Sequence, residues 1–508
     1  MKIGQLLEGL DIINISGDIA GDVSTLCYVS EKCENNSMFV AIAGLKYDGH
    51  DYIMDAIARG ARFIVHEKDF KFPYHVTAVK VSDSRRSLGT LAANYFGRPS
   101  NDLCLTAVVG TNGKTTITYL MESILQAAGY RCGVLGTVNY RFNNNVCPAP
   151  NTTPESYEMQ RILREMADGG VTHVIAEVSS HAVDLRRVDD CAFDLGIFTN
   201  LTRDHLDYHK TMENYYQAKK RFFAEVLPSA KKTAAKKMVI NADDESGRRM
   251  IQELGQPAIT YGLENESSIK AQDYNLSLAG IQATIRAEGE NIKISSPLIG
   301  KFNLYNILAA AGAATLLKIP ADKIKAGIEI LFNVPGRLER VKTDSGFFVF
   351  VDYAHTDDAL KNVLQNLAVL KKNKIITVFG CGGDRDHGKR PLMGAAATAL
   401  SDFSIVTSDN PRSEDPLSII SEIENGIDTG IVKKVGGTER NTANSCRCYT
   451  VIPDRKKAIE TAIALAAVGD IVLIAGKGHE DYQILGNVRM PFDDRVVAEA
   501  ALKLRSRT

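Results

Sequence analysis

The sequence predicts an α/β protein of three domains. A chain of 508 residues is too long for one hydrophobic core, and usual domain sizes suggest about three units. Short apolar runs alternate with stretches of helical spacing, which is typical of parallel sheets covered by helices. A turn-rich stretch, GRPSND, closes the first block, and a new series of strands begins near residue 333. We therefore expect domains at 1–98, 99–332 and 333–508.

The three expected domains differ in pattern. The first mixes strand-like runs (SMFVAIAG, ARFIVHE, HVTAVKVSD) with a helical segment near Tyr52 to Arg59, which indicates a small mixed α/β domain. The second alternates the strands CLTAVVG, VTHVIAEVS and LGIFTNL with helical patterns such as TTITYLMESILQAAG. The third contains the strands FFVFVDYA, KIITVFG, FSIVTSD and DIVLIAG, which end in glycine or polar residues. Ligands gather at such strand ends, so we expect a Rossmann-like third domain.

The composition argues against several classes of partner. Lys plus Arg is 60 and Asp plus Glu is 61, so no overall charge attracts nucleic acid or an acidic membrane. No window of about eighteen apolar residues occurs, and no membrane insertion is expected. The N-terminus does not resemble a signal peptide. The nine cysteines are scattered without paired CxxC spacing, which predicts a reduced, cytoplasmic protein without a structural zinc site.

The stretch AVVGTNGKTTITYL, from Ala107 to Leu120, predicts a phosphate-binding loop. The common pattern has an additional glycine where this chain has Val108, so the loop is shortened. It lies between an apolar strand and a helical pattern, where backbone N–H groups and the helix dipole attract phosphate. Lys114 adds a charge for the outer phosphates, and Thr115 can hold Mg²⁺. A glycine turn with an incidental lysine is the alternative, which this context disfavours. We expect a P-loop-type central domain that binds a nucleoside triphosphate.

Acidic and histidine side chains follow the next two strands. Glu177 stands at a strand end, from which a carboxylate can reach a Mg²⁺ ion held by the phosphate loop. Taken alone, such a residue is more often a surface or capping group. The segment FTNLTRDHLDYHKTMENYYQAKKRFF then delivers a cluster after another strand. This cluster contains Asp204, His205, Asp207 and His209. Lys219 follows on a helix that is expected to begin near Met212, where a solvent-facing lysine would be the ordinary interpretation.

Twelve motifs in a fixed order resemble one enzyme family. They are GTNGKTT, NTTPE, EVSSH, TNLTRDHLDYH, YYQAKK, NADD, GKFNLYN, PGRLE, DYAHT, GDRD, DNPR and GKGHEDYQ. Their order resembles the Mur ligases of peptidoglycan synthesis, and within that family the MurE type. The resemblance covers essentially the whole chain and is strongest from residue 107 onward. It implies a cytoplasmic, monomeric, ATP-dependent amide ligase that adds meso-diaminopimelate to UDP-MurNAc-L-Ala-D-Glu through an acyl phosphate.

The resemblance also implies the nucleotide and metal site. The ATP-binding residues would be Gly110, Thr111, Asn112, Gly113, Lys114, Thr115, Thr116, Asn306, Arg337 and Asp352. Thr115 and Glu177 would hold one Mg²⁺. Lys219, carried as N6-carboxylysine, would hold a second Mg²⁺ together with His205, because that modification supplies anionic oxygen ligands. The implied catalytic residues are Lys114, Lys219, His205 and Glu177.

The implied site for the nucleotide sugar matches less evenly. Asn151, Thr152, Thr153, Ser179 and Arg187 match family positions that hold UDP-MurNAc-dipeptide. Ser30 aligns with a uridine-site serine, but the family's Asp-Ser-Arg reads Val29, Ser30, Glu31 here. A glutamate in place of an arginine changes the expected contacts with uracil and diphosphate.

The DNPR segment is implied to choose the added amino acid. The far end of diaminopimelate bears a carboxylate, which a planar arginine fork can bind through two hydrogen bonds. The implied residues are Arg385, Asp409, Asn410, Pro411, Arg412, Gly476 and Glu480. DNPR can also be a tight Asn-Pro turn at a strand end, and both interpretations can hold together.

Several alternative functions remain open from the sequence alone. The same ligase could add L-lysine, and a folylpolyglutamate synthase shares the loop but is not expected to show DNPR or GKGHEDYQ. A MurF-type ligase is disfavoured on the same grounds. A nucleotide-gated binding module would need a partner surface, and no basic stripe or heptad run offers one. A degenerate relative is suggested only by the altered surroundings of Ser30.

The base for the attacking amine is also open, with His205, His209 and His355 as candidates by residue type.

Overall fold

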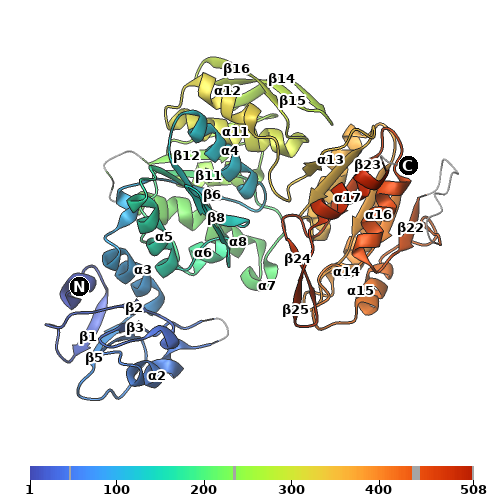
Figure 1. Ribbon diagram of the computed structural model, residues 1–508. Helices are drawn as coiled ribbons and strands as arrows, with labels where there is room; N and C mark the ends of the chain where they lie inside the picture. The colour runs from blue at the N-terminus through green and yellow to red at the C-terminus, as the bar shows by residue number, and fades with distance from the viewer. Residues whose placement is uncertain (45–46, 231, 233–235, 437–446, 506–508) are drawn as a thin grey trace. The chain divides into compact units, whose positions relative to one another are not determined.

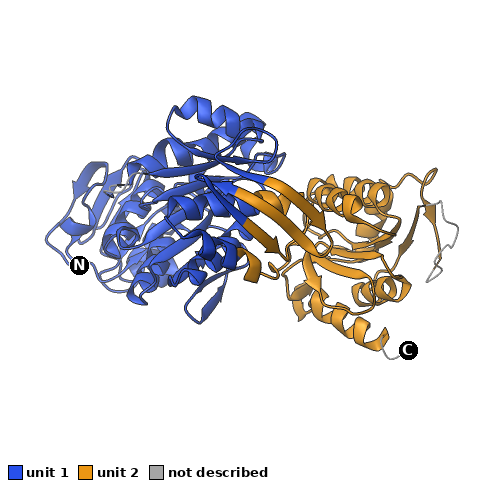
Figure 2. Cartoon of the chain, turned by 90° about the horizontal axis from the view of Figure 1, so that it is seen from above, with its two compact units in different colours: residues 1–271, 286–292, 306–327 blue, residues 272–285, 293–305, 328–508 orange. Residues whose placement is uncertain are grey.

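The computed structural model describes residues 1–44, 47–230, 232, 236–436 and 447–505. Cys446, one of the nine scattered cysteines, lies outside the described residues. The chain forms two compact units. Unit 1 comprises residues 1–271, 286–292 and 306–327, and unit 2 comprises residues 272–285, 293–305 and 328–508 (Figure 2). The polypeptide therefore passes between the units more than once.

A five-stranded sheet occupies the N-terminal part of unit 1 (Figure 1). Its strand order is β1-β5-β4-β3-β2, with β1 antiparallel to β5 and the other pairs parallel. The strands are β1 (Ile12–Ser16), β2 (Leu26–Cys27), β3 (Met38–Val40), β4 (Phe63–His66) and β5 (Thr77–Val81), and the helices are α1 (Ile3–Leu6), α2 (Ile53–Ala58) and α3 (Ser84–Tyr95). Separate buried apolar clusters include Val40 and Ile64, so both faces of the sheet are covered. This is the mixed α/β domain that the sequence predicts.

The central sheet is built around β6, the strand that leads into the phosphate loop. Its eleven strands follow the order β16-β15-β14-β13-β12-β11-β6-β10-β7-β8-β9. They are β6 (Cys104–Val109), β7 (Cys132–Leu135), β8 (Asn139–Phe142), β9 (Asn145–Pro148), β10 (His173–Val178), β11 (Leu195–Phe198), β12 (Lys237–Asn241), β13 (Ile259–Gly262), β14 (Ile269–Ser277), β15 (Gly280–Ala287) and β16 (Glu290–Ser296). β6 pairs in parallel with both β10 and β11, so its C-terminal end lies between the ends of those strands.

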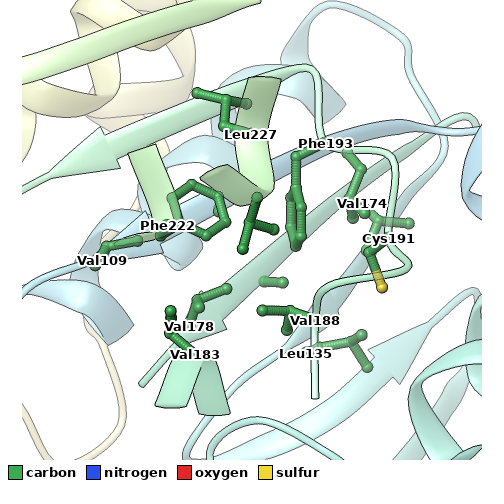
Figure 3. Close-up of a cluster of buried hydrophobic side chains, with 14 of the residues drawn as sticks. Val109, Leu135, Val174, Val178, Val183, Val188, Cys191, Phe193, Phe222 and Leu227 are labelled. Carbon is green, nitrogen blue, oxygen red and sulfur yellow. The ribbon is translucent and has the colours of Figure 1, made fainter. Parts of the chain in front are cut away.

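The helices that accompany this sheet bury its apolar residues. They are α4 (Lys114–Ala127), α5 (Ser156–Asp168), α6 (Ser180–Asp184), α7 (Leu206–His209), α8 (Met212–Arg221), α9 (Leu227–Ser229), α10 (Glu245–Leu254), α11 (Lys301–Leu316) and α12 (Ala321–Ile330). Figure 3 shows Val109 of β6 and Val178 of β10 in one cluster with Phe193 and Phe222. These side chains are almost fully buried, and close packing of this kind fixes the strands that carry the site.

Unit 2 contains a seven-stranded sheet in the order β17-β18-β23-β19-β20-β22-β21, with only β17 antiparallel. The strands are β17 (Glu339–Val341), β18 (Phe348–Asp352), β19 (Ile375–Phe379), β20 (Phe403–Val406), β21 (Lys433–Lys434), β22 (Cys448–Val451) and β23 (Ile471–Ala475), followed by a hairpin of β24 (Tyr482–Leu485) and β25 (Val488–Pro491). The helices are α13 (Asp357–Leu370), α14 (Lys389–Leu400), α15 (Pro416–Glu424), α16 (Arg455–Leu465) and α17 (Asp494–Arg505). Apolar clusters on both faces make this the Rossmann-like layer that the sequence predicts.

Candidate active site

The phosphate loop needs its two glycines for steric reasons. Gly110 has φ 152° and Gly113 has φ 87°, both in the region that side chains rarely adopt. A Cβ on Gly110 would stand 1.8 Å from Thr199 Oγ1, so only glycine fits there. Helix α4 begins at Lys114, directly after Gly113. The loop therefore presents the N-terminal end of a buried helix, which is the expected setting for phosphate.

The end of β11 holds the phosphate loop in place. The backbone amide of Asn112 donates to Asn200 Oδ1, and the backbone amide of Thr111 donates to the Asn200 carbonyl, both at 2.9 Å. Thr199 Oγ1 donates to the Asn112 carbonyl at 2.7 Å. Sequence reasoning quoted TNLT but gave no role to Thr199 or Asn200. Thr199 and Asn200 lie beside the phosphate loop because β11 pairs with β6.

Lys114 lies over the loop that precedes it. Its Nζ donates to the carbonyl oxygens of Gly110 (3.0 Å) and Thr111 (2.8 Å). Thr115 and Thr116 are buried in the first turn of α4. Asn306 also lies at this loop, because a Cβ on Gly113 would stand 2.3 Å from Asn306 Oδ1. The structure thus brings together the phosphate-loop residues and Asn306, as the sequence motifs suggested.

Glu177 lies at the end of β10, where the strand pattern placed it. Its side chain is 1% exposed, and it stands in register with Val108 of β6. Thr137, which follows β7, donates its amide to Oε1 (3.0 Å) and its hydroxyl to Oε2 (2.9 Å). The carboxylate is therefore oriented by one residue that sequence reasoning missed. No local signal in GTVN identifies Thr137 as its partner.

Most of the residues expected at the nucleotide sugar form one network with Glu177. Thr153 Oγ1 donates to the Glu177 carbonyl (2.8 Å) and accepts the Ser179 amide (3.0 Å). Arg187 donates to the Thr153 carbonyl at 3.2 Å. Thr152 contacts Thr137 through their hydroxyls at 3.1 Å, and the Asn151 carbonyl accepts the Tyr140 hydroxyl. This segment is thus anchored at the same strand ends as the phosphate loop.

Ser30 belongs to a different part of unit 1. It is buried in a short 3-10 helix, Ser30–Lys32. The hydrogen bond from its hydroxyl lowers the pKa of the Asp55 carboxyl, and Arg59 lowers that pKa further. Glu31 is exposed. Arg85 of α3 donates its guanidinium to Glu155 Oε2, at the start of α5, at 3.0 Å.

Lys219 is buried beneath the histidine cluster. It lies on α8, which begins at Met212 as predicted, and its side chain is 1% exposed. Its Nζ stands 4.3 Å from the centre of the Tyr215 ring. Burial lowers the pKa of this amine well below its usual value, and the charge of Lys114 lowers it further. Solvent exposure, the ordinary interpretation of this lysine, is therefore wrong.

Three histidines gather next to this lysine. His205 has φ 54° and contacts His181 and Tyr215 at ring separations of 4.9 and 6.0 Å. His209 Nε2 lies 2.9 Å from Ser180 Oγ. Burial lowers the pKa of all three rings, to about 4 for His181, which sequence reasoning did not single out. The rings are therefore neutral near pH 7, the state in which imidazole nitrogen can bind a metal or accept a proton.

The donor set fits Mg²⁺ only if other oxygen ligands are added. Within the described residues, no group of three or more His, Cys, Asp or Glu side chains is arranged to hold a metal ion. Mg²⁺ usually completes its six ligands with water and substrate phosphates. The lowered pKa of Lys219 favours the neutral amine, which is the form that can react with carbon dioxide, and the resulting carbamate would supply anionic oxygens here.

Unit 2 brings Arg337 and Asp352 together. Asp352 ends β18, where its carboxylate accepts the amides of Leu338 (2.6 Å) and Ala354 (2.8 Å). Burial raises the pKa of this carboxyl, and Arg337 opposes that shift. The Arg337 guanidinium stands 5.4 Å from the Tyr353 ring.

The segments DNPR and GKGHE meet through a buried lysine. Asn410 Nδ2 donates to Glu480 Oε2 at 2.8 Å. Lys477, which is fully buried, donates to Asn410 Oδ1 (3.0 Å) and Glu480 Oε2 (3.1 Å). A Cβ on Gly476 would stand 2.7 Å from Asp409 Oδ2. Sequence reasoning chose the flanking residues and missed Lys477, which joins them.

The β24–β25 hairpin closes over DNPR. Ile484 donates its amide to Asn410 Oδ1 (3.0 Å) and accepts the Arg412 amide (3.1 Å). Gln483 Nε2 donates to the Asp409 carbonyl at 2.6 Å. Pro411 lies between these contacts, and the hairpin therefore fixes the backbone on both sides of it. The sequence pattern did not predict this hairpin.

A buried strand that leads into a glycine loop at a helix N-terminus, followed by further α/β layers, defines a nucleotide-binding α/β enzyme. Models of three families match the chain in order. They are the Mur ligase family, catalytic domain (residues 22–96), the Mur ligase middle domain (108–314) and the Mur ligase, glutamate ligase domain (336–478). The chain belongs to the Mur ligase family, whose members are ATP-dependent amide ligases.

Individual relatives extend this result over the full length. A protein of Geobacter metallireducens named UDP-N-acetylmuramoyl-L-alanyl-D-glutamate--2,6-diaminopimelate ligase is 44% identical, covering 99% of this chain and 98% of that protein. A protein of the same name from Clostridium tetani is 40% identical over 99% of both chains. A solved structure with that name matches at 32% identity and TM-score 0.71, covering both chains fully. MurF of Acinetobacter baumannii, at 16% identity and TM-score 0.63 with 94% and 95% coverage, shares the fold.

Among the described residues, no helix is long and apolar enough to cross a membrane.

Proposed function

We propose that this chain joins meso-diaminopimelate to UDP-MurNAc-L-Ala-D-Glu, with conversion of ATP to ADP and phosphate. The observation that carries the proposal is 44% identity over nearly the full length to a relative named for this reaction. The DNPR segment supports the choice of amino acid, because Arg412 lies in the loop after β20, and Asn410 of the same loop bonds Glu480. We place the reaction in the cytoplasm and expect a monomer.

The residues of unit 1 serve the phosphoryl transfer in this proposal. Lys114 would exchange its bonds with the Gly110 and Thr111 carbonyls for bonds with phosphate oxygens. Thr115, Glu177, His205 and carboxylated Lys219 would hold two Mg²⁺ ions, which when bound neutralise charge on the transferred phosphoryl group. The two hydrogen bonds from Thr137 fix the Glu177 carboxylate at the end of β10, which supports this assignment.

The substrates then react in two steps. The D-glutamyl carboxylate attacks the γ-phosphorus of ATP, which releases ADP and leaves an acyl phosphate. The diaminopimelate amine attacks the acyl carbon, and phosphate leaves as the amide forms. The role of the protein is to position both partners and to exclude water that would hydrolyse the acyl phosphate.

The test is phosphate release with ATP, Mg²⁺ and UDP-MurNAc-L-Ala-D-Glu, with meso-diaminopimelate compared with L-lysine. We expect a strong preference for diaminopimelate. Arg412→Lys should reduce that preference by about 10-fold or more, because lysine cannot bind a carboxylate through two parallel hydrogen bonds. Preference for L-lysine would overturn the assigned amino acid, and no release with either would overturn the assigned reaction.

A further inference from the structure

Two arginine-bearing loops leave neighbouring strands of unit 2. The first, residues 380–388, follows β19 and carries Arg385, and the second, residues 407–415, follows β20 and carries Arg412. β19 and β20 are parallel, with Phe379 opposite Val406, so both loops start at the same edge. Arg412 Nη1 and Arg385 Cγ both lie within 4 Å of the point where a Cβ on Gly382 would stand.

Arg390 and Glu414 connect the two loops from behind. The Arg390 side chain is fully buried in the first turn of α14 and donates Nη1 to Glu414 Oε2 and Nη2 to Glu414 Oε1, both at 2.8 Å. Glu414 Oε1 also accepts the amide of Asp384. One carboxylate on the second loop thus fixes the backbone of the first, beside Arg385.

Asp384 and Ser413 add a second connection. Ser413 Oγ donates to Asp384 Oδ1 (2.5 Å), and the Ser413 amide donates to Asp384 Oδ2 (3.2 Å). Asp384 and Arg412 both have φ 53°, a conformation that persists in such residues only when the surroundings fix it. We call Arg390, Glu414, Asp384 and Ser413 the loop clamp.

The loop clamp leaves the two arginines without acidic partners. In the described part of the chain, Arg385 and Arg412 donate only to backbone carbonyls, those of Asp384 and Gly383. Two carboxylates of these loops already have partners, Glu414 in Arg390 and Asp384 in Ser413. A Glu414 carboxylate that lost Arg390 would stand two residues from Arg412 and compete for its guanidinium.

We propose that Glu414 is a positioning residue, which keeps Arg385 and Arg412 together and unpaired so that they can bind the distal carboxylate of a diamino dicarboxylic acid. The inference rests on the proposed function. It assigns selectivity to the contacts that hold the two arginine loops at a fixed separation, in addition to the arginines themselves.

The test compares Glu414→Gln with the matched control Glu422→Gln. Glu422 Oε2 accepts the same Arg390 Nη1 at 3.0 Å and contacts His387, but it touches neither Asp384 nor Ser413. Glu414→Gln should raise the KM for diaminopimelate about 10-fold or more, because it weakens a charge-assisted pair. The KM values for ATP and UDP-MurNAc-L-Ala-D-Glu should stay within about 2-fold, and discrimination against L-lysine should fall. Glu422→Gln should leave all of these within about 2-fold.

Ser413→Ala provides a second variant at an exposed position, in case Glu414→Gln does not fold. It removes one hydrogen bond to Asp384 and should raise the KM for diaminopimelate by about 3-fold. The KM values for ATP and UDP-MurNAc-L-Ala-D-Glu should not rise with it. Unchanged KM and discrimination in the folded variants would overturn the positioning role, and so would an equal rise in KM for all three substrates. The wild-type enzyme is measured alongside, and its failure to use diaminopimelate would instead overturn the proposed function.

Discussion

Lys219 shows how burial can change the chemistry of one residue. Its helix position follows from the sequence, but its burial does not, since YYQAKK gives no reason to bury the first lysine rather than the second. Lys220 pairs with Glu253 at 2.7 Å, whereas Lys219 packs on Tyr215, and burial lowers the pKa of its amine. A neutral amine is the nucleophile that carboxylation by carbon dioxide requires.

The lowered pKa of Lys219 predicts a pH-dependent stability difference. In metal-free protein without carbon dioxide, burial lowers the pKa of the native amine well below 10.5, the value at which the unfolded amine releases its proton. Wild-type stability should therefore rise with pH between the lowered native pKa and 10.5, by up to about 1.4 kcal/mol per pH unit. Lys219→Met removes this pH dependence. The free energy of unfolding of the variant should therefore exceed that of the wild type most at low pH, and the difference should shrink toward pH 10.5. Urea unfolding at several pH values measures this, and a pH-independent difference would contradict it.

The phosphate loop is the element that the sequence predicts best. GTNGKTT lies between a strand and a helix in the structure as in the pattern, because both flanking elements are determined by local apolar spacing. The side chains that hold the loop are less predictable. Thr199 and Asn200 are about ninety residues away and act here only because β11 pairs with β6.

Two glycines at the ends of α4 provide a matched test of this element. Gly113 (φ 87°) and Gly129 (φ 85°) have nearly the same positive φ, but a Cβ meets Asn306 Oδ1 at Gly113 and nothing within 4 Å at Gly129. Alanine at either position should cost about 1 kcal/mol of stability through backbone strain. Only Gly113→Ala should raise the KM for ATP, by about 10-fold or more, since it displaces Asn306 from the loop. Equal KM values in the two variants would show that Asn306 has no role there.

At the scale of the whole molecule, each compact unit carries its own part of the chemistry. Unit 1 holds the phosphate loop, Glu177 and Lys219, and unit 2 holds DNPR and the loop clamp. Unit 2 also contains a buried ion pair in which Arg455 donates to Asp494 at 2.8 and 2.6 Å, joining α16 to α17. Breaking that pair should therefore affect unit 2 alone.

Asp494→Asn should destabilise unit 2 by about 3 kcal/mol or more, because it leaves the Arg455 charge buried without its partner. ADP affinity, measured under folding conditions, should stay within about 2-fold of wild type, because the substitution changes the stability of unit 2 and not the nucleotide-binding residues. Glu460→Gln is the control, because it breaks an exposed pair with Lys456 on the same helix and should cost less than about 0.5 kcal/mol. Urea unfolding with ADP titration separates the outcomes, and a loss of ADP affinity in folded Asp494→Asn would contradict a purely stabilising role for the ion pair.

The sequence by itself determined the α/β layers, the phosphate loop and the membership of the family. These features depend on residues near one another in the chain, whose apolar period and turn chemistry are visible in one dimension. Only the tertiary structure decided that Thr137 orients Glu177, that Lys477 joins Asn410 to Glu480, and that Arg390 and Glu414 hold the arginine loops. Those partners come from different strand ends, and they meet because the strand order places the ends side by side, which no local pattern encodes.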